Sequence, residues 1–349
     1  MIVVNARFLT QKLTGVQRFA FEMSCQLMEL YHDDILFVAP RNIRRSRYSD
    51  QLKPVLIGKY TGYLWEQYEL PRYLKKRGCP LLLNLCNLAP VVYRNKISTI
   101  HDITFVKYPA DYPFRMRWMY KMLVPHILNT SIRIITVSHF SKNEISAYYQ
   151  IPKDKIHVVY NAVNASFGPQ RNERLLSERY IMAFASTGEN KNFKMIMQSF
   201  IKVNEQYKDI KLYVIGECLR EKEYDELRLH DSIVFMGRVS DEKLIELYSN
   251  AIAFVFPSLY EGFGIPVIEA QACGCPVIAS NVTTFPEILG ASALCIDPHK
   301  TDGFVDAILS LFRDIELRDK YIKLGYDNVT RFSWQKSGKE LMRIMNSLS

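Results

Sequence analysis

The fold is decided by the stretch Phe256-Pro-Ser-Leu-Tyr-Glu-Gly-Phe-Gly-Ile-Pro-Val-Ile-Glu-Ala-Gln-Ala-Cys-Gly-Cys-Pro-Val-Ile-Ala-Ser280. The apolar runs at residues 251–256 and 276–279 predict two buried strands. Between them, two glycines around Phe263 predict a loop, and Pro266 suits the first turn of a helix, where its missing N–H costs nothing. Strand, glycine-rich loop, helix and strand are typical of a nucleotide-binding unit, because the loop and the helix start offer backbone N–H groups to a ligand.

Two glutamates eight residues apart, Glu261 and Glu269, stand out in this stretch. Glu261 falls on the predicted loop and Glu269 about one turn into the helix, so both can face one ligand. A carboxylate accepts hydrogen bonds from vicinal hydroxyls, which makes a ribose or a hexose a natural partner. An acid before a helix and another on it are also common without any function, so the spacing alone is a weak signal.

The whole segment resembles the donor-sugar motif of retaining glycosyltransferases of family 4, in its Glu-Gly-Phe-Gly-Ile-Pro core, its eight-residue interval and its Ala-Cys-Gly-Cys-Pro-Val-Ile-Ala-Ser continuation. The resemblance implies an α/β protein of the GT-B fold, with two Rossmann-like doubly wound domains facing across a cleft. It implies that Glu261 meets the donor sugar and Glu269 the nucleotide ribose. The donor-binding loop residues it implies are Gly262, Phe263, Gly264 and Ile265.

Composition agrees with two domains of ordinary size. The chain has 349 residues, 48% of them hydrophobic, and no apolar run approaches the roughly 20 residues of a membrane span. The first residues, Met-Ile-Val-Val-Asn, read as a strand rather than a signal peptide. Seven cysteines are scattered without a Cys-x2-Cys pair, which indicates reduced thiols in a cytoplasm.

The basic excess is confined to the first half of the chain. Residues 1–163 hold 23 Lys and Arg against 11 Asp and Glu, whereas the second half is slightly acidic. Basic clusters at 41–47, 75–77 and 115–121 are interspersed with Tyr and Trp. Such a pattern suits an anionic membrane surface or a phosphorylated acceptor, and also nucleic acid or a plain solvated face.

Alternating strands and helices predict two doubly wound α/β domains. In the first, strands are expected at residues 1–8, 35–39, 81–85, 97–100, 132–137 and 156–160, helices at 14–31, 63–76, 114–129 and 138–149, and a basic loop at 41–50. In the second, strands are expected at 180–185, 211–215, 233–236, 251–256 and 276–279, and helices at 192–207, 221–229, 241–249, 266–273, 301–314 and 317–330. The predicted domains are an acceptor-binding domain at 1–163 and a donor-binding domain at 164–331, with the terminal segment 332–349 packing on the first.

Two segments of the first half are candidate site elements. Gly15 and Arg18 lie between the first strand and the first helix, a phosphate-binding position that lacks the G-x-G-x-x-G fingerprint. His101-Asp102 follows a strand at its carboxyl end, and Asp102 can fix the tautomer of the histidine ring. The resemblance, here to the mannosyltransferase-like branch of the family, implies that Gly15 faces the donor phosphates and acceptor and that His101 approaches the donor sugar.

In the second half, Lys191 is expected to begin the first helix of its domain. A lysine opposes the helix dipole there, which indicates a bound anion, and the resemblance implies that this anion is the donor diphosphate. The arginine that often precedes this lysine is replaced by Asn190, so Arg238 is an alternative phosphate cation. Arg238 and Val239 match the family's turn near the nucleotide base.

The resemblance implies a retaining hexosyltransferase without a cofactor. Because no Asp-x-Asp pair is present, we expect no requirement for a metal ion. The expected donor is GDP-mannose, followed by dTDP-rhamnose and UDP-hexoses, and the expected acceptor is a glycan or a polyprenyl-linked oligosaccharide of a bacterial surface polysaccharide. We expect a cytoplasmic protein, peripheral at the inner face of the membrane, that binds no nucleic acid. The alternatives are a nucleotide-sugar epimerase of the same fold and a basic nucleic-acid-binding protein.

Overall fold

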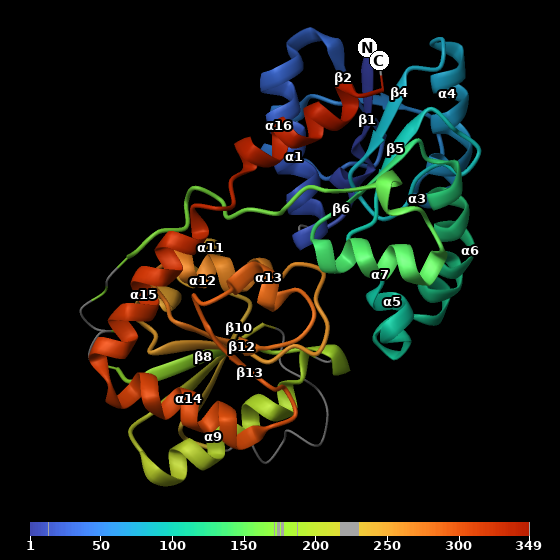
Figure 1. Cartoon of the computed structure of the whole chain (residues 1–349). Coiled ribbons are helices and arrows are strands. Elements are labelled where there is room, and N and C mark those ends of the chain that lie inside the picture. The colour runs from blue at the N-terminus through green and yellow to red at the C-terminus, as the bar shows by residue number, and fades with distance from the viewer. Residues whose placement is uncertain are drawn as a thin grey trace. The chain divides into compact units, whose positions relative to one another are not determined.

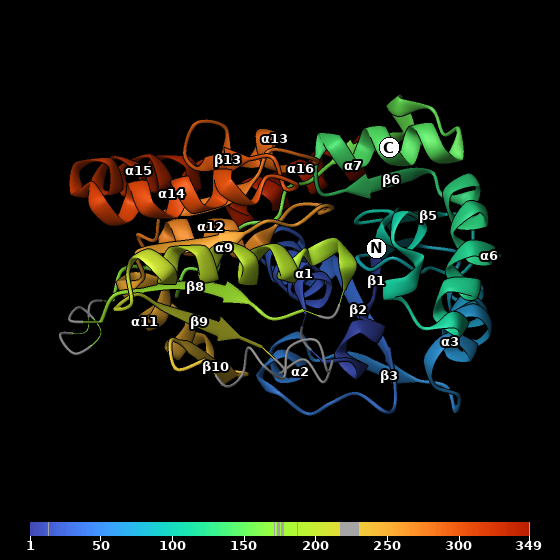
Figure 2. The same cartoon turned by 90° about the horizontal axis from the view of Figure 1, so that it is seen from below.

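The structure is a computed structural model that describes residues 1–12, 14–170, 172, 175, 178–186, 188–216 and 230–348 (Figure 1). It divides into two compact units, one formed by Met1–Asn161 with Ser333–Ser349 and the other by Ala162–Phe332. The division falls two residues before the boundary expected from the sequence. Each unit has one sheet with helices on both faces, which is the predicted architecture (Figures 1 and 2).

The first unit contains a seven-stranded sheet of order β3-β2-β1-β4-β5-β6-β7, and every pairing in it is parallel. The chain runs outward from β1 to β3 and then returns to β4, so the strand order reverses between β1 and β4. Ligands of doubly wound folds bind at the carboxyl ends of the strands at such a switch point. The strands are β1 Ile2–Asn5, β2 Ile35–Pro40, β3 Val55–Ile57, β4 Leu81–Asn84, β5 Lys96–Thr99, β6 Arg133–Thr136 and β7 Ile156–Val158.

Helices of the first unit cover this sheet with apolar faces. On one side, Trp65, Leu70 and Leu74 pack on Val3 and Leu82 of the central strands. The helices are α1 Gly15–Tyr31, α2 Arg47–Leu52, α3 Gly62–Leu64, α4 Leu70–Lys76, α5 Thr104–Lys107, α6 Phe114–Thr130, α7 His139–Tyr149 and α16 Trp334–Asn346, and a π-helical segment, Trp65–Glu69, joins α3 to α4.

The terminal helix α16 packs against α1 of the first unit. Its buried residues Trp334, Leu341 and Ile344 recur on one face, and the ring of Trp334 meets that of Phe19 edge-on at 6.2 Å. The apolar face of α16 is thus the face that α1 covers.

The second unit repeats the same plan with a six-stranded parallel sheet of order β10-β9-β8-β11-β12-β13, whose order reverses between β8 and β11. Its strands are β8 Tyr180–Phe184, β9 Lys211–Ile215, β10 Ile233–Gly237, β11 Ala253–Phe256, β12 Val277–Ser280 and β13 Leu294–Ile296. Its helices are α9 Phe193–Gln206, α11 Asp241–Asn250, α12 Ile265–Ala272, α13 Phe285–Leu289, α14 Thr301–Arg313 and α15 Ile315–Val329. The helix expected at 221–229 lies outside the described residues.

The structure corrects several sequence expectations. The strand predicted over residues 1–8 ends at Asn5, because the Asn5 side chain accepts a hydrogen bond from the Arg7 N–H and caps a 3-10 helix, Ala6–Thr10. The predicted basic loop at 41–50 contains the start of α2, which Ser46 caps. The short elements β3, α13 and β13 were not predicted, because segments of three to five residues are too short to show a hydrophobic period.

Candidate functional site

The loops that follow β8 and β11 are tied together at the switch point of the second sheet. The Asn190 side chain donates to the carbonyl of Tyr260 at 3.1 Å, and the N–H of Leu259 donates to the carbonyl of Asn190 at 2.7 Å. Asn192, in the left-handed region at φ 54°, donates its side-chain amide to the carbonyl of Pro298 at 2.9 Å. The bond between Asn190 and Tyr260 fixes the positions of the two residues that follow them, Lys191 and Glu261.

Lys191 and Glu261 form an ion pair at this point. The Lys191 Nζ lies 2.5 Å from the Glu261 Oε1 and 5.7 Å from the centroid of the Phe256 ring. The lysine side chain is 33% exposed and that of the glutamate 13%, so the pair is partly open to solvent. Lys191 occupies a 3-10 turn, Glu189–Lys191, and α9 begins only at Phe193, which corrects the expectation that the lysine lies in the first turn of that helix.

The glycine loop has a backbone that only glycine adopts without strain. Gly264 has φ 87°, and a Cβ placed on it would lie 2.9 Å from the ring of Phe285. It precedes α12, where Ile265 and Pro266 begin the helix. The neighbouring Gly262 is buried. The Phe263 ring is buried edge-on against Phe332 at 5.5 Å.

Glu269 lies on α12 and is buried, among the apolar residues Val267, Ile268 and Ala270. A charged carboxylate in such surroundings needs partners. Arg238 and Val239 instead follow β10, the edge strand, and β9 separates β10 from β8. The structure therefore brings Lys191 and Glu261 into contact and leaves Arg238 on another part of the sheet edge.

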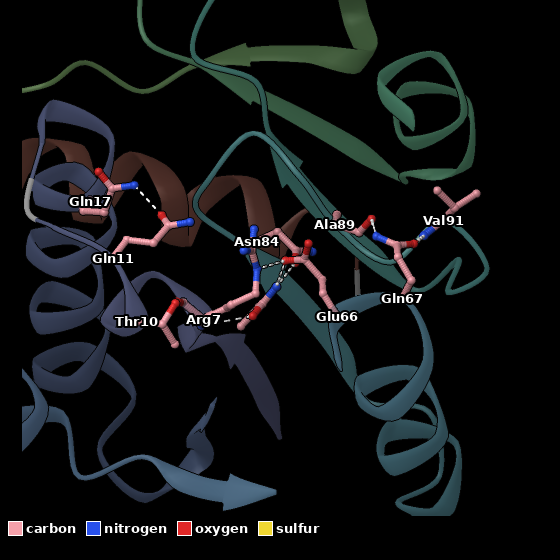
Figure 3. A network of polar contacts seen from close by, with 10 residues as sticks. Arg7, Thr10, Gln11, Gln17, Glu66, Gln67, Asn84, Ala89 and Val91 are labelled. Atoms are coloured by element: carbon pink, nitrogen blue, oxygen red, sulfur yellow. Dashed lines mark hydrogen bonds and ion pairs between the residues drawn. The ribbon is translucent and has the colours of Figure 1, made fainter. Parts of the chain in front are cut away.

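The switch point of the first sheet holds a buried polar network that the sequence did not predict (Figure 3). The Glu66 Oε1 accepts from the Arg7 Nε at 2.9 Å and from the Asn5 Nδ2 at 2.8 Å, and the Asn5 Nδ2 also donates to the Asn84 Oδ1 at 2.9 Å. The Arg7 guanidinium lies over the ring of Tyr63, 4.8 Å from its centroid. Burial acts to lower the pKa of Arg7, but the charge and hydrogen bond of Glu66 outweigh it, so the pKa stands above its ordinary value.

His101 follows β5 and is also buried. Its Nε2 lies 3.1 Å from the carbonyl of Leu85, which can only accept, so Nε2 carries the proton and Nδ1 is the acceptor. The Asp102 carboxylate instead accepts from the N–H of Thr104 at 2.8 Å, at the start of α5. The backbone of Leu85, and not Asp102, therefore sets the tautomer. Burial lowers the pKa of His101, against the opposite effects of the Leu85 bond and the Asp102 charge.

Gly15 is the first residue of α1, and Arg18 lies one turn further along. The N–H of Thr14 donates to the Gln17 side chain at 3.2 Å, and the Gln17 amide donates to Gln11 at 2.6 Å (Figure 3). Gln11 lines the same small pocket as Arg7, so the start of α1 is linked to the buried network. Gly15 and Arg18 therefore lie near the switch point of the first sheet, as the fold analogy requires.

Two absences among the described residues bear on metal ions and membranes. Within those residues, no three His, Cys, Asp or Glu side chains are grouped as a metal site requires. In the same part of the chain, no helix has the length and apolarity needed to cross a bilayer.

Two doubly wound sheets, each with polar residues at its switch point, agree with the GT-B fold of glycosyltransferases. Comparison with known proteins agrees: the model for glycosyl transferases group 1 matches residues 167–328, and that for glycosyltransferase family 4 matches residues 13–167. The chain belongs to glycosyltransferase family 4 and is a glycosyltransferase.

Two relatives and one solved structure illustrate the similarity. The chain is 28% identical to the O-antigen chain mannosyltransferase RfbU of Salmonella typhimurium, over 89% of this chain and 90% of that protein. It is 31% identical to O-antigen chain mannosyltransferase B of Escherichia coli, over 68% and 67%. The fold matches that of the Anabaena protein HepE, crystallised with UDP and glucose, with a TM-score of 0.75 at 14% identity and 99% coverage of both chains.

The environment of His101 leads to a testable expectation. Because burial lowers its pKa, His101 should stay neutral in the folded protein below the ordinary histidine pKa of about 6.5. The unfolded chain takes up the proton there and the folded chain does not, so this residue removes stability as the pH falls below about 6.5.

Nitrogen-15 NMR of the histidine rings between pH 5 and 8 measures both points. We expect a neutral His101 with the proton on Nε2 at pH values above about 6.5, and a flatter loss of stability with acid in His101→Asn. The exposed His126 provides an internal reference signal. A His101 protonated at pH 7, or one carrying its proton on Nδ1, contradicts this description.

Proposed function

We propose that this glycosyltransferase moves mannose from GDP-mannose to a hydroxyl of a glycan or lipid-linked oligosaccharide during synthesis of a bacterial surface polysaccharide, with retention of configuration and without a metal ion. The names of the two relatives, both O-antigen chain mannosyltransferases, support the sugar and the pathway class. The observation that carries the proposal is the Lys191–Glu261 ion pair at the switch point of the second sheet. dTDP-rhamnose and UDP-hexoses are the next donors to test, the latter because HepE was crystallised with UDP.

In this proposal the pair binds two parts of one donor. An ammonium group has three donors, so Lys191 can keep its bond to Glu261 and still donate to a diphosphate oxygen. The N–H of Ile265, the first residue of α12, adds a further donor to the phosphates. Glu261 accepts from a hydroxyl of the sugar, and Glu269 from the ribose.

The proposed chemical step needs no protein nucleophile. The acceptor oxygen forms a bond to the sugar C1 on the face that the diphosphate leaves, and the bond from C1 to the phosphate oxygen breaks with its electron pair on the phosphate. The acceptor's proton passes to that phosphate oxygen. Negative charge grows on the diphosphate, and Lys191 with the Ile265 N–H stabilises it. Glu261, engaged by Lys191, serves as a hydrogen-bond acceptor.

Substitutions at the pair should separate the two roles. Lys191→Ala should weaken binding of free GDP by about tenfold and slow turnover further, because the leaving-group charge is largest in the transition state. Glu261→Ala should lower turnover while GDP binding stays within about threefold of the parent. Glu269→Ala should weaken GDP and free guanosine alike, since the ribose is common to both. Isothermal titration calorimetry and initial rates measure these effects.

The exposed Lys320→Ala of α15 is the matched control and should change neither quantity. If Glu261→Ala loses GDP while Lys191→Ala retains it, the assignment of the pair is wrong. Lower melting temperatures with unchanged kinetics in all three variants would show that these residues only stabilise the fold.

Metal independence has its own test. Because Lys191 and the Ile265 N–H stabilise the phosphate charge in this proposal, transfer should survive incubation with EDTA at unchanged rate. Assays with and without added Mg²⁺ or Mn²⁺ measure this. Full loss with EDTA and recovery with either ion would refute the proposed charge balance.

We also propose that the first unit binds an anionic membrane through α6. Phe114, Trp118 and Met122 recur every four residues on this helix and are 70%, 60% and 49% exposed. The helix has no acidic residue but carries Arg115, Arg117 and Lys121. Aromatic and apolar side chains beside cations suit the headgroup region of an anionic bilayer.

A groove of about 490 Å³ runs beside this face, within the first unit. Six apolar or aromatic residues and two cations line it: Phe105, Val106, Pro109, Pro125, Tyr148 and Tyr149, with Arg117 and Lys121. The nearby Lys107 is already paired with Glu144 at 2.7 Å. By contrast the aromatic rings of Trp65 and Tyr120 are buried in the core and form no part of this surface.

Vesicle binding tests this surface. The double variant Arg115→Gln/Lys121→Gln should bind vesicles rich in phosphatidylserine roughly tenfold more weakly, since each cation contributes up to about 1 kcal/mol. Trp118→Ser should reduce binding as well, and added salt should weaken the parent. Cosedimentation with anionic and with neutral vesicles measures the difference.

Ile315→Ser and Lys320→Gln change an equally exposed apolar residue and a cation of the second unit, and should leave vesicle binding unchanged. Equal partitioning of the parent onto neutral and anionic vesicles would argue against the proposal.

A further inference from the structure

The buried network of the first unit leaves two polar atoms without partners. In the part of the chain that the structure describes, the Glu66 Oε2 and the Asn84 Nδ2 are buried and have no hydrogen-bond partner. Both residues are 1% exposed. The partners of the other atoms are fixed, because the Glu66 Oε1 holds Arg7 and Asn5, and the Asn84 Oδ1 holds Asn5 (Figure 3). An acceptor and a donor without a protein partner therefore line the same pocket.

These two residues line one small pocket at the switch point between β1 and β4. Its volume is about 10 Å³, which is the space of one water molecule or one hydroxyl group. Arg7 and Gln11 also line it, as do Leu85 and Cys86. Glu66 reaches it from the π-helical segment Trp65–Glu69, a distortion that is frequent at functional sites.

The chemistry of the pocket selects a neutral group that both donates and accepts. Arg7 balances the charge of Glu66, so the site has no net charge with which to attract a phosphate or a cation. A hydroxyl can donate its proton to the Glu66 Oε2 and accept from the Asn84 Nδ2 at the same time. A carboxylate could only accept from the Asn84 Nδ2, and an ammonium group could only donate to the Glu66 Oε2.

The position of the pocket connects it to the expected acceptor region. Leu85 lines the pocket, and its carbonyl is the partner of the His101 ring. Gln11, on the other side, is bonded to Gln17 of α1 (Figure 3). The pocket is thus linked to His101, which the resemblance assigns to the donor sugar, and to the start of α1, where it assigns Gly15 to the donor phosphates and acceptor.

We propose that Glu66 and Asn84 bind one hydroxyl of the sugar acceptor and so orient it for transfer. This inference rests on the proposed function, because it takes the first unit as the acceptor-binding unit. Glu66 is a hydrogen-bond acceptor here and not a base, since Arg7 holds it as an ion pair. Arg7 and Asn5 are positioning residues that act through Glu66.

Glu66→Gln and Asn84→Leu test the site without changing the number or branching of the side-chain heavy atoms. In Glu66→Gln, Arg7 and Asn5 keep the oxygen as their acceptor, so the amide nitrogen faces the pocket and the hydroxyl proton loses its partner. We expect the KM or Kd for a bound glycoside to rise about tenfold in each variant, with GDP binding unchanged. The probes are methyl glycosides of mannose and other common hexoses, with their monodeoxy analogues, added to the full-length protein with GDP.

The matched control is Gln67→Ala. Gln67 neighbours Glu66 on the same π-helical segment, but its side chain bonds the backbone at Ala89 and Val91, both at 2.9 Å (Figure 3). Its loss should lower the melting temperature and leave glycoside binding unchanged. The deciding comparison uses one deoxy sugar: it should bind the parent about tenfold more weakly than its glycoside, and the difference should vanish in Glu66→Gln.

Each other outcome counts against the inference. If the variants lower only the melting temperature and the deoxy penalties persist, the pocket holds a structural water and no acceptor. A parent protein that binds none of the glycosides overturns the inference as well. If GDP and GDP-mannose also fail to bind, the proposed function fails with it, and the two failures are thereby distinguished.

Discussion

The donor site depends on the hydrogen bonds that join the loop after β8 to the loop after β11. Asn190 is buried, and it both donates its side-chain amide to Tyr260 and accepts from the N–H of Leu259. Lys191 and Glu261 each come one residue after these bonded groups, so the ion pair follows from the backbone contact and not from charge attraction alone. A buried amide keeps such partners because leaving them unmade costs about 1–3 kcal/mol.

The two sheets share one strand order but present different electrostatics at their switch points. The Lys191–Glu261 pair is partly exposed, so its bonds can be exchanged with a charged ligand at little cost. The Arg7–Glu66 pair is buried, and opening it would leave a charge unpaired in the interior, at about 3–5 kcal/mol. A charged diphosphate therefore suits the second unit, and an uncharged hydroxyl suits the first.

The sequence predicted most long elements, because α1, α9 and α14 have clear apolar faces and the central strands are continuous apolar runs. It also identified Glu261 and Lys191, but not that they touch, since 70 positions separate them and periodicity is local. Arg7 was missed because it was assigned to a strand that the Asn5 cap in fact ends. Glu66 was missed because Trp65-Glu66-Gln67 reads as an ordinary helical surface, and only the packing of Trp65 turns the glutamate inward. The one available signal for a buried Glu66 was its position directly after Trp65 in a helix with several apolar residues.

Stability does not explain the network around Glu66. Replacing a buried ion pair by apolar residues of similar volume is often neutral or stabilising by about 1–4 kcal/mol, so Arg7 and Glu66 are not there to hold the unit together. The unpartnered Glu66 Oε2 and Asn84 Nδ2 add a further cost of about 1–3 kcal/mol each. These two polar atoms lie near the carboxyl ends of β1 and β4, which is where doubly wound sheets bind their ligands. In the proposed complex, a hydroxyl that enters the pocket gives both atoms a hydrogen-bond partner. The free energy of these two hydrogen bonds orients the acceptor.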